Sequence, residues 1–543
     1  MNVYDFDGKL QEYFFQSFSD IKIVDWRDWL KIDSREEFED LALKLSGLEQ
    51  TENLYDMLKS KKTNSRSFSV EYKKFIENYE GKDPLIFCHT SGSTNSSLAG
   101  LKWFFFSQSL IQRLWAPGMR AIFESSGLNT TNSAIIFVPS RMNIDGLNHI
   151  NERKYVSLYS AEFSQRIMLS IIKPKNYLFY EYKNSRNIEI ISKILDMDKI
   201  SAISAPAVTV LNWADLDKFK YGLQKSISSN SNKKELESNT LFELIKRKGL
   251  DDAAKIIQNR LSNKLSNATL IFSITSLSES KWSLLAKFMN WKKGEEKFTN
   301  LYVGSEIGPF ASSLSYDIAR SNLMYVFPLT VPVIEYRGNK NLITQTIIKR
   351  GNLLISRFDN SQPLINIDTG DIISVENNEK IPLMRGEILR NNFQLKYSIK
   401  MSEKVRTPPL YEILAGDYFL FDEFELVDPK NLLRCLKSKC ELKNDSLLLL
   451  KSQNNNGFWR LILPSNTNTQ CETIDDYLTQ IFKCPYEKSF QQAIKENDIV
   501  VELIDDNPID FLASREEILS KVRHGHIPKG ILKKWPIYIV IPS

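Results

Sequence analysis

From residue 84 onward the chain alternates short apolar runs with segments of helical spacing, and this alternation restricts the possible folds more than any other feature. The runs at residues 85–87 and 134–138 end at turn residues, whereas residues 108–122 between them have a helix-like pattern. Strand-like runs separated by helical segments are typical of layered α/β domains. The sequence therefore predicts an α/β fold in which β-sheets pack against helices.

The two ends of the chain differ from this central part. Apolar residues recur every three or four positions between residues 21 and 80, which predicts a helical preface over residues 1–80. Beyond residue 390 the pattern predicts a smaller α+β unit. We therefore expect a large layered N-terminal domain over residues 1–389 and a small C-terminal domain over residues 390–543.

A zone rich in β-branched residues lies in the second half of the large domain. Its apolar runs are separated by short turns, a pattern that predicts a barrel-like or antiparallel subdomain. The runs cover residues 324–333, 342–348, 352–358 and 372–375.

Composition excludes several classes of function. The 543 residues carry a formal net charge of +5, so the surface is nearly balanced and gives no argument for a nucleic-acid partner. The five cysteines include no C-x-x-C pair, which indicates reduced, mostly structural thiols. The polar start and the lack of an apolar run near the ~18 residues of a membrane helix predict a cytoplasmic protein without a membrane span.

A run of hydroxyls and glycines follows the apolar strand at residues 85–88. Backbone N–H groups and hydroxyls in such a loop suit a polyphosphate, and a lysine at the end of the loop adds a positive charge. The loop has no Walker sequence, and a solvated Ser/Gly loop is the alternative interpretation. The residues concerned are Thr90, Ser91, Gly92, Ser93, Thr94 and Lys102.

Two later turns also carry chemistry. Glu306 follows Gly304 and Ser305 at the end of an apolar strand, a position that suits a magnesium ligand. Asp371 ends the turn at residues 369–371, where its carboxylate could accept two hydrogen bonds from a ribose diol. Taken singly, each is compatible with an ordinary turn between strands.

In this order and at these separations the three stretches resemble the adenylate-forming superfamily, which includes acyl-CoA synthetases, luciferases and the adenylation domains of peptide synthetases. Residues 90–94 resemble its T-S-G-S/T-T-G loop, residues 302–306 its Y-G-x-S/T-E motif and residues 369–371 its T-G-D. Residues 305–309 and 363–365 are more similar to the phenylacetate-CoA ligase and acyl-protein synthetase branch. Residues 390–396 resemble the hinge of the family.

The resemblance implies an ATP-dependent ligase that activates a small or hydrophobic carboxylic acid as an acyl-adenylate. Residues 90–94 and Lys102 would hold the β- and γ-phosphates, and Ser305 and Glu306 the α-phosphate and Mg²⁺. Tyr302 would stack beside adenine. Asp371 and Arg390 would bind the ribose.

The resemblance also implies a catalytic lysine on a mobile C-terminal domain and an acyl pocket in the large domain. Lys529 and Lys533 are both candidates for that lysine. The pocket would be formed by segments that contain Asn143, Asp145, Ser276 and Gly304. Asp145 could meet a substrate ammonium, or it could be a surface residue in an Asx-turn.

The acceptor of the acyl group stays open at this point. A thiol is the default, either of CoA or of the phosphopantetheine of an acyl or peptidyl carrier protein. An amide- or protein-acyl-forming ligase is the alternative. A non-catalytic descendant that binds a nucleotide or a partner is a third, because Asn95 and Val303 replace glycines of the family and no Gly-Lys pair occurs near the C-terminus.

Overall fold

The structure is a computed structural model. It describes residues 3–32, 35–46, 56, 58–60, 62, 71–89, 101–229, 236–273, 279–314, 323–336, 338–343, 350–357 and 364–377. After these it describes nine separate strands, which are 397–402, 411–414, 418–421, 424–427, 447–451, 459–464, 482–483, 499–504 and 537–540.

The central element is a 13-stranded mixed sheet, in the order β1-β7-β4-β8-β9-β10-β11-β12-β17-β16-β15-β13-β14. Its first part, from β1 to β10, is parallel. The strands of this part are β1 (Val3–Asp5), β7 (Asn176–Glu181), β4 (Ser133–Val138), β8 (Ile200–Ser204), β9 (Thr269–Ser273) and β10 (Phe298–Gly304). The predicted run at residues 134–138 is thus a strand.

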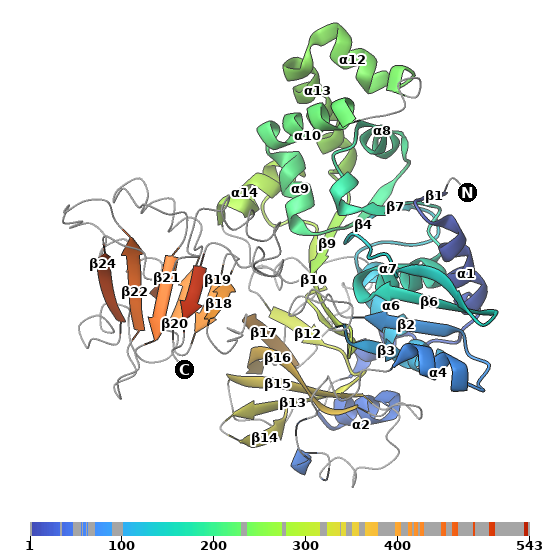
Figure 1. Cartoon of the computed structure of the whole chain (residues 1–543), viewed down its shortest axis with the longest axis vertical. Coiled ribbons are helices and arrows are strands. Elements are labelled where there is room, and N and C mark those ends of the chain that lie inside the picture. The colour runs from blue at the N-terminus through green and yellow to red at the C-terminus, as the bar shows by residue number, and fades with distance from the viewer. Residues whose placement is uncertain are drawn as a thin grey trace.

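Helices cover both faces of the parallel part. Successive residues of β4 point to opposite faces, so Ile136 packs in one core and Ile135 in the other. The first core contains α1 (Gly8–Phe18), α6 (Ala116–Ser125) and α7 (Ser160–Ile172). The second contains α8 (Ile188–Asp196), α9 (Ala207–Ala214), α10 (Leu216–Ser229), α12 (Thr240–Lys248), α13 (Leu250–Leu265) and α14 (Glu279–Phe288). Figure 1 shows the helices α8 to α13 gathered on one side of β4 and α1, α6 and α7 on another. The predicted packing of sheets against helices is confirmed.

The second part of the sheet is antiparallel, as the β-branched zone predicts. The run at 324–333 forms two strands rather than one, because Pro328 between them has no N–H to donate to a ladder. β17 pairs with β16, so the sheet extends past residue 389; a closed barrel and the division into two domains stay predictions. The strands are β11 (Gly308–Ser312), β12 (Leu323–Val326), β13 (Val331–Tyr336), β14 (Asn339–Leu342), β15 (Arg350–Arg357), β16 (Leu364–Asn377) and β17 (Tyr397–Ser402).

A separate four-stranded sheet has the order β3-β2-β6-β5. Its strands are β2 (Leu85–His89), β3 (Trp103–Phe105), β5 (Gly146–Ile150) and β6 (Arg153–Tyr159). β2 is buried along its whole length, with Ile86 in the first core and Phe87 in a smaller aromatic cluster that includes Phe75 and Phe105. β2 is therefore held by side chains on both faces.

Most of the described preface is helical, but the prediction of a helical segment over residues 1–80 is wrong at its start, where β1 joins the central sheet beside β7. The preface contains α1, a 3₁₀-helix η1 (Trp26–Lys31), α2 (Arg35–Ser46) and α4 (Tyr72–Asn78). The helix predicted over 108–122 is irregular, since α5 (Gln108–Leu110) passes through one π-helical stretch, η4 (Ile111–Trp115), into α6. Pro117 at the start of α6 has no N–H to donate, which accounts for the altered hydrogen bonding. A 3₁₀-helix η5 (Tyr182–Asn184) follows β7.

The C-terminal part contributes two further sheets, ordered β18-β25-β21-β22-β24 and β19-β20-β23. The strand expected near residues 537–541 is β25, which lies between β18 and β21. The strands are β18 (Tyr411–Leu414), β19 (Tyr418–Phe421), β20 (Phe424–Val427), β21 (Leu447–Lys451), β22 (Trp459–Pro464), β23 (Phe482–Lys483), β24 (Ile499–Ile504) and β25 (Ile537–Val540).

Buried ion pairs join β1 to α7. Arg166 in α7 is fully buried, and its Nη1 lies 2.9 Å from Oδ2 of Asp5 in β1. Its Nε lies 2.8 Å from Oε1 of Glu162, one turn earlier in α7. Arg141, after β4, contacts the same Glu162 carboxylate and places Nη1 2.7 Å from Oδ2 of Asp7. The N-terminal strand is thus held in the sheet by paired charges as well as by its ladder to β7. Within the described residues, no helix has both the length and the apolar content needed to cross a bilayer.

We expect Arg166→Met to destabilise the protein by about 3–5 kcal/mol, because it leaves the buried Asp5 carboxylate without its cation and leaves Glu162 with Arg141 alone. The midpoint of urea unfolding measures this. Lys175→Met is the matched control, since its pair with Asp198 spans 3.8 Å between exposed side chains and contributes about 0–1 kcal/mol. Equal midpoints for the two variants would show that the buried network does not stabilise the fold.

Candidate active site

The β2–β3 hairpin brings together the two ends of the predicted phosphate loop. Its antiparallel register places His89 opposite Trp103. Thr90 directly follows His89 and Lys102 directly precedes Trp103. The chain therefore leaves β2 and enters β3 at the same end of the strand pair. Thr90, Ser91, Gly92, Ser93 and Thr94 themselves lie outside the described residues, whereas Lys102 is described.

The β10–β11 hairpin presents Glu306 in its turn. Gly304 pairs with Gly308 across the hairpin, and residues 305–307 connect them. A Cβ at Gly304 would lie 2.7 Å from Cγ1 of Ile307. Gly308 has φ +72°, and a Cβ there would lie 2.9 Å from Cγ of Leu114. Both positions require glycine, which fixes how tightly the turn that carries Glu306 is closed.

Lys102 and Glu306 face each other, although they belong to motifs far apart in the sequence. Lys102 Nζ lies 4.0 Å from Glu306 Oε1, and the side chains are 26% and 21% exposed. The pair is therefore open to solvent on one side. A cation at the end of one loop and a carboxylate in a second turn thus meet at one point.

Ser305 and Tyr302 flank this pair. Ser305 is buried and donates a hydrogen bond of 2.9 Å to Oγ of Ser160, the first residue of α7. Tyr302 is half-buried, and its ring meets that of Phe310 edge to face at 5.3 Å. The hydroxyl of Ser305 thus joins β10 to α7, while Phe310 orients the Tyr302 ring.

Asp145 lies in neither of the two environments expected from the sequence, which are a site for a substrate ammonium and a surface turn. Its side chain is 1% exposed, with Oδ1 2.6 Å from Nε2 of His89. Its Oδ2 accepts a hydrogen bond of 2.7 Å from the backbone N–H of Met142. Both carboxylate oxygens are therefore bound within the protein, which fits neither a surface residue nor an open site for a substrate ammonium. Asn143 in the same turn is exposed. His89 was not predicted as a site residue, because its pairing with Asp145 has no local sequence signal.

The T-G-D stretch lies within the continuous strand β16, so the prediction of a turn at residues 369–371 is wrong. Asp368, before this stretch, contacts Lys62 with 3.3 Å between Oδ2 and Nζ, and Lys62 also contacts Glu335 at 2.5 Å. Burial alone would lower the pKa of the Lys62 ammonium, but the two carboxylates outweigh it and the pKa lies above its ordinary value. Asp371 belongs to the same strand, but its side chain is outside the described part. Ser276, Arg390, Lys529 and Lys533 also lie outside the described residues.

The chemistry of the site fits magnesium only in company with phosphates. Across the part of the chain that the structure describes, no three His, Cys, Asp or Glu side chains cluster in a way that could hold a metal ion. Mg²⁺ is commonly bound by one or two carboxylates together with substrate phosphates. A single carboxylate such as Glu306, next to a cationic side chain, is compatible with that mode.

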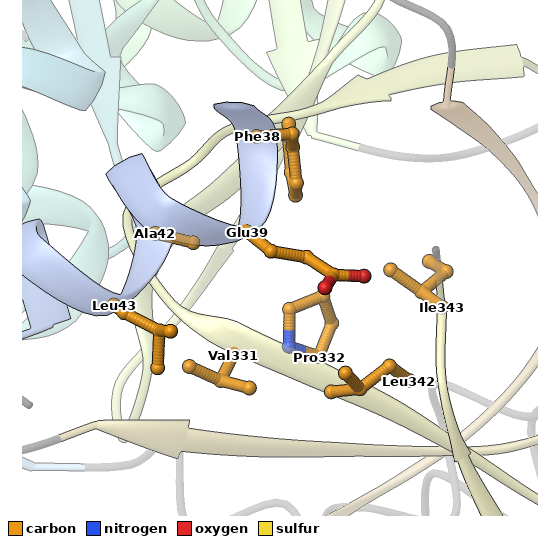
Figure 2. Close-up of a pocket in the computed structure, with 8 residues that line it drawn as sticks. All are labelled: Phe38, Glu39, Ala42, Leu43, Val331, Pro332, Leu342 and Ile343. Carbon is orange, nitrogen blue, oxygen red and sulfur yellow. The ribbon is translucent and has the colours of Figure 1, made fainter. Parts of the chain in front are cut away.

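An apolar groove lies elsewhere, between α2 and the β13–β14 hairpin (Figure 2). Glu39 is the charged residue of its lining, and Figure 2 shows its side chain beside Pro332. The groove contains none of the predicted site residues. The remaining lining residues are Phe38, Ala42, Leu43, Val331, Leu342 and Ile343.

No protein-family model matches the chain, and no curated protein matches it in sequence. A comparison with solved structures does find matches, at low similarity. One is 2-hydroxyisobutyryl-CoA ligase in complex with 2-HIB-AMP and CoA, at 8% identity and a TM-score of 0.45, with 92% of this chain and 87% of the other covered. The two described next are also named as a ligase or a synthetase.

Coronafacic acid ligase from Pectobacterium brasiliense has 13% identity and a TM-score of 0.33, with 81% of this chain and 66% of the other covered. An amide bond synthetase from Marinactinospora thermotolerans has 7% identity and a TM-score of 0.33, with coverages of 76% and 66%. All three TM-scores lie below 0.5, so the function has to be inferred from this chain's own residues.

Proposed function

We propose that the protein is an ATP-dependent adenylate-forming ligase. In the first step a carboxylate oxygen attacks the α-phosphorus of ATP, the bond to the β-phosphate oxygen breaks, and pyrophosphate leaves. In the second step a nucleophile attacks the acyl carbon, and AMP leaves. The observation that carries the proposal is the meeting of Lys102 and Glu306 at 4.0 Å, which joins the phosphate-loop hairpin to the Gly-Ser-Glu turn.

Charge explains why this arrangement suits ATP. A partly exposed ion pair contributes about 0–1 kcal/mol, so a triphosphate can displace Glu306 from Lys102 at small cost. The Lys102 ammonium would then contact the β- and γ-phosphates. The Glu306 carboxylate would become available as a ligand of the Mg²⁺ that accompanies the nucleotide, where the ion supplies charge neutralisation. Backbone groups of residues 90–94 would hold the same phosphates.

The other predicted roles form part of the proposal. Tyr302 would lie beside adenine, Asp371 and Arg390 at the ribose, and Asn143, Ser276 and Gly304 along the acid. Lys529 or Lys533 would bridge the carboxylate and the α-phosphate during the first step. A thiol of CoA or of a carrier protein is the proposed acceptor.

A screen of ATP–pyrophosphate exchange with aryl, fatty and amino acids tests the proposal directly. Exchange that depends on one class of acid is expected, because only adenylate formation returns labelled pyrophosphate to ATP. Hydroxylamine, CoA and amine acceptors added to the active acid then separate thiol from amide transfer. A chain that binds ATP but shows no exchange with any acid would instead be a nucleotide-binding protein without ligase activity.

We expect Lys102→Ala to raise the KM for ATP in this exchange by about tenfold or more, since it removes the described cation at the end of the phosphate loop. Lys154→Ala is the matched control, because Lys154 is exposed on β6 in the same sheet. An unchanged KM for Lys102→Ala would place the phosphates elsewhere.

We expect Glu306→Gln to lower kcat for exchange on the order of 10²-fold, because an amide cannot supply the negative charge that a metal ligand needs. Its magnesium requirement should also shift to higher concentration. Glu295→Gln, at an exposed carboxylate, should leave both unchanged. Normal activity of Glu306→Gln at ordinary magnesium would exclude Glu306 as the ligand.

A further inference from the structure

His89 and Asp145 form a buried pair at the point where the predicted phosphate loop begins. The 2.6 Å contact joins Nε2 of His89 to Oδ1 of Asp145, and both side chains are 1% exposed. His89 is the last residue of β2, and the loop starts at the next residue. Any movement of the His89 backbone therefore passes directly to Thr90.

The imidazole of His89 lies among aromatic rings of the neighbouring strands. Trp103 of β3 and Tyr159 of β6 are its register partners, with ring centroids 5.1 Å and 6.1 Å from that of His89. These contacts limit the imidazole to a narrow range of orientations. The nitrogen that faces Asp145 is thus fixed by packing as well as by the hydrogen bond.

Asp145 lies in a short turn between β4 and β5, and the turn is held by hydrogen bonds at one end and by ion pairs at the other. At one end its backbone N–H donates to the carbonyl of Met142 at 3.0 Å, and its carboxylate accepts from the N–H of Met142. At the other end Arg141 contacts Glu162 and Asp7. Asn143, which lies between Arg141 and Asp145 in the sequence, is exposed. The turn therefore presents one polar side chain on a rigid base.

We propose that the His89–Asp145 pair is a positioning device that sets the start of the phosphate loop and the acid-binding turn relative to each other. The inference rests on the proposed function and adds residues to it. His89 and Asp145 touch neither reactant in this account; they act through Thr90 and Asn143. Because the loop and the turn each hold one reactant in this account, a displacement of either segment weakens the binding of the reactant that it holds.

The pair suits this role better than an apolar contact would. A hydrogen bond between buried groups is directional and is strengthened by the low local dielectric. The rest of β2 is held by apolar side chains such as Ile86 and Phe87, whose contacts are not directional. The polar pair therefore specifies the position of the strand end.

The test uses variants that leave no unpaired buried charge. In Asp145→Asn the amide oxygen can accept from Met142 and the amide NH₂ can donate to neutral His89, so both contacts are retained. In the double variant His89→Phe/Asp145→Asn the link between the two segments is lost, while an aromatic ring still packs against Trp103 and Tyr159. His149→Phe, at an exposed histidine of β5, is the matched control.

The KM for ATP and the KM for the acid are measured in the exchange assay, together with the thermal midpoint. We expect both KM values to rise about tenfold or more in the double variant and to stay within about threefold of wild type in Asp145→Asn and His149→Phe. A contact that is only structural would lower the thermal midpoint and the fraction of active protein, but would leave both KM values unchanged.

Each outcome separates this inference from the proposed function. If wild type performs exchange and the double variant keeps both KM values, the positioning role is wrong. If the KM for one reactant alone rises, the pair does not couple the two segments, and the inference is also wrong. If wild type shows no exchange with any acid, the proposed function fails, and the positioning role fails with it.

Discussion

A charge that is removed from water has to be paired, and this requirement joins parts of the chain that are distant in the sequence. Arg166 is fully buried in α7, where carboxylates from β1 and from α7 itself surround its guanidinium. Arg141 shares one of these carboxylates and reaches Asp7 at the start of α1. Solvent cannot replace Asp5 as the partner of Arg166, because both side chains are fully buried. β1, α7 and the turn after β4 are therefore restricted to one mutual arrangement.

That arrangement has consequences at the candidate site. α7 begins at Ser160, whose hydroxyl accepts the hydrogen bond from Ser305. The turn after β4 ends at Asp145, which binds His89. The Gly-Ser-Glu turn and the phosphate-loop hairpin are thus each connected to an element that the buried ion pairs hold in place. Glu306 and Lys102 meet because the Ser305–Ser160 contact and the His89–Asp145 contact both lead to elements that the same buried ion pairs hold in place.

The sequence predicted the local features of this fold well and the long-range ones poorly. The apolar runs that became β2 and β4 were predicted nearly to the residue, because burial on both faces leaves a continuous apolar pattern. The Gly-Ser-Glu turn was predicted from its residue types. The break at Pro328 and the π-helical stretch before Pro117 were missed, since hydrophobic spacing gives no information on a single lost hydrogen bond. The His89–Asp145 pair was missed because it depends on tertiary contact between strands.

The exposure of each ion pair separates structural from functional charge. Arg166 and Asp5 are fully buried, so exchanging either partner for a ligand would strand a charge at a cost of several kcal/mol. Lys102 and Glu306 are about a quarter exposed and 4.0 Å apart, so solvent already screens them and each can change partners at little cost. A site that binds and releases a polyanion needs partly exposed charges of the Lys102–Glu306 kind. These charges have to be carried by a fold that buried ion pairs of the Arg166–Asp5 kind hold in place. The His89–Asp145 pair is as buried as these structural ion pairs and lies one residue from the predicted phosphate loop, in keeping with the positioning role that we propose for it.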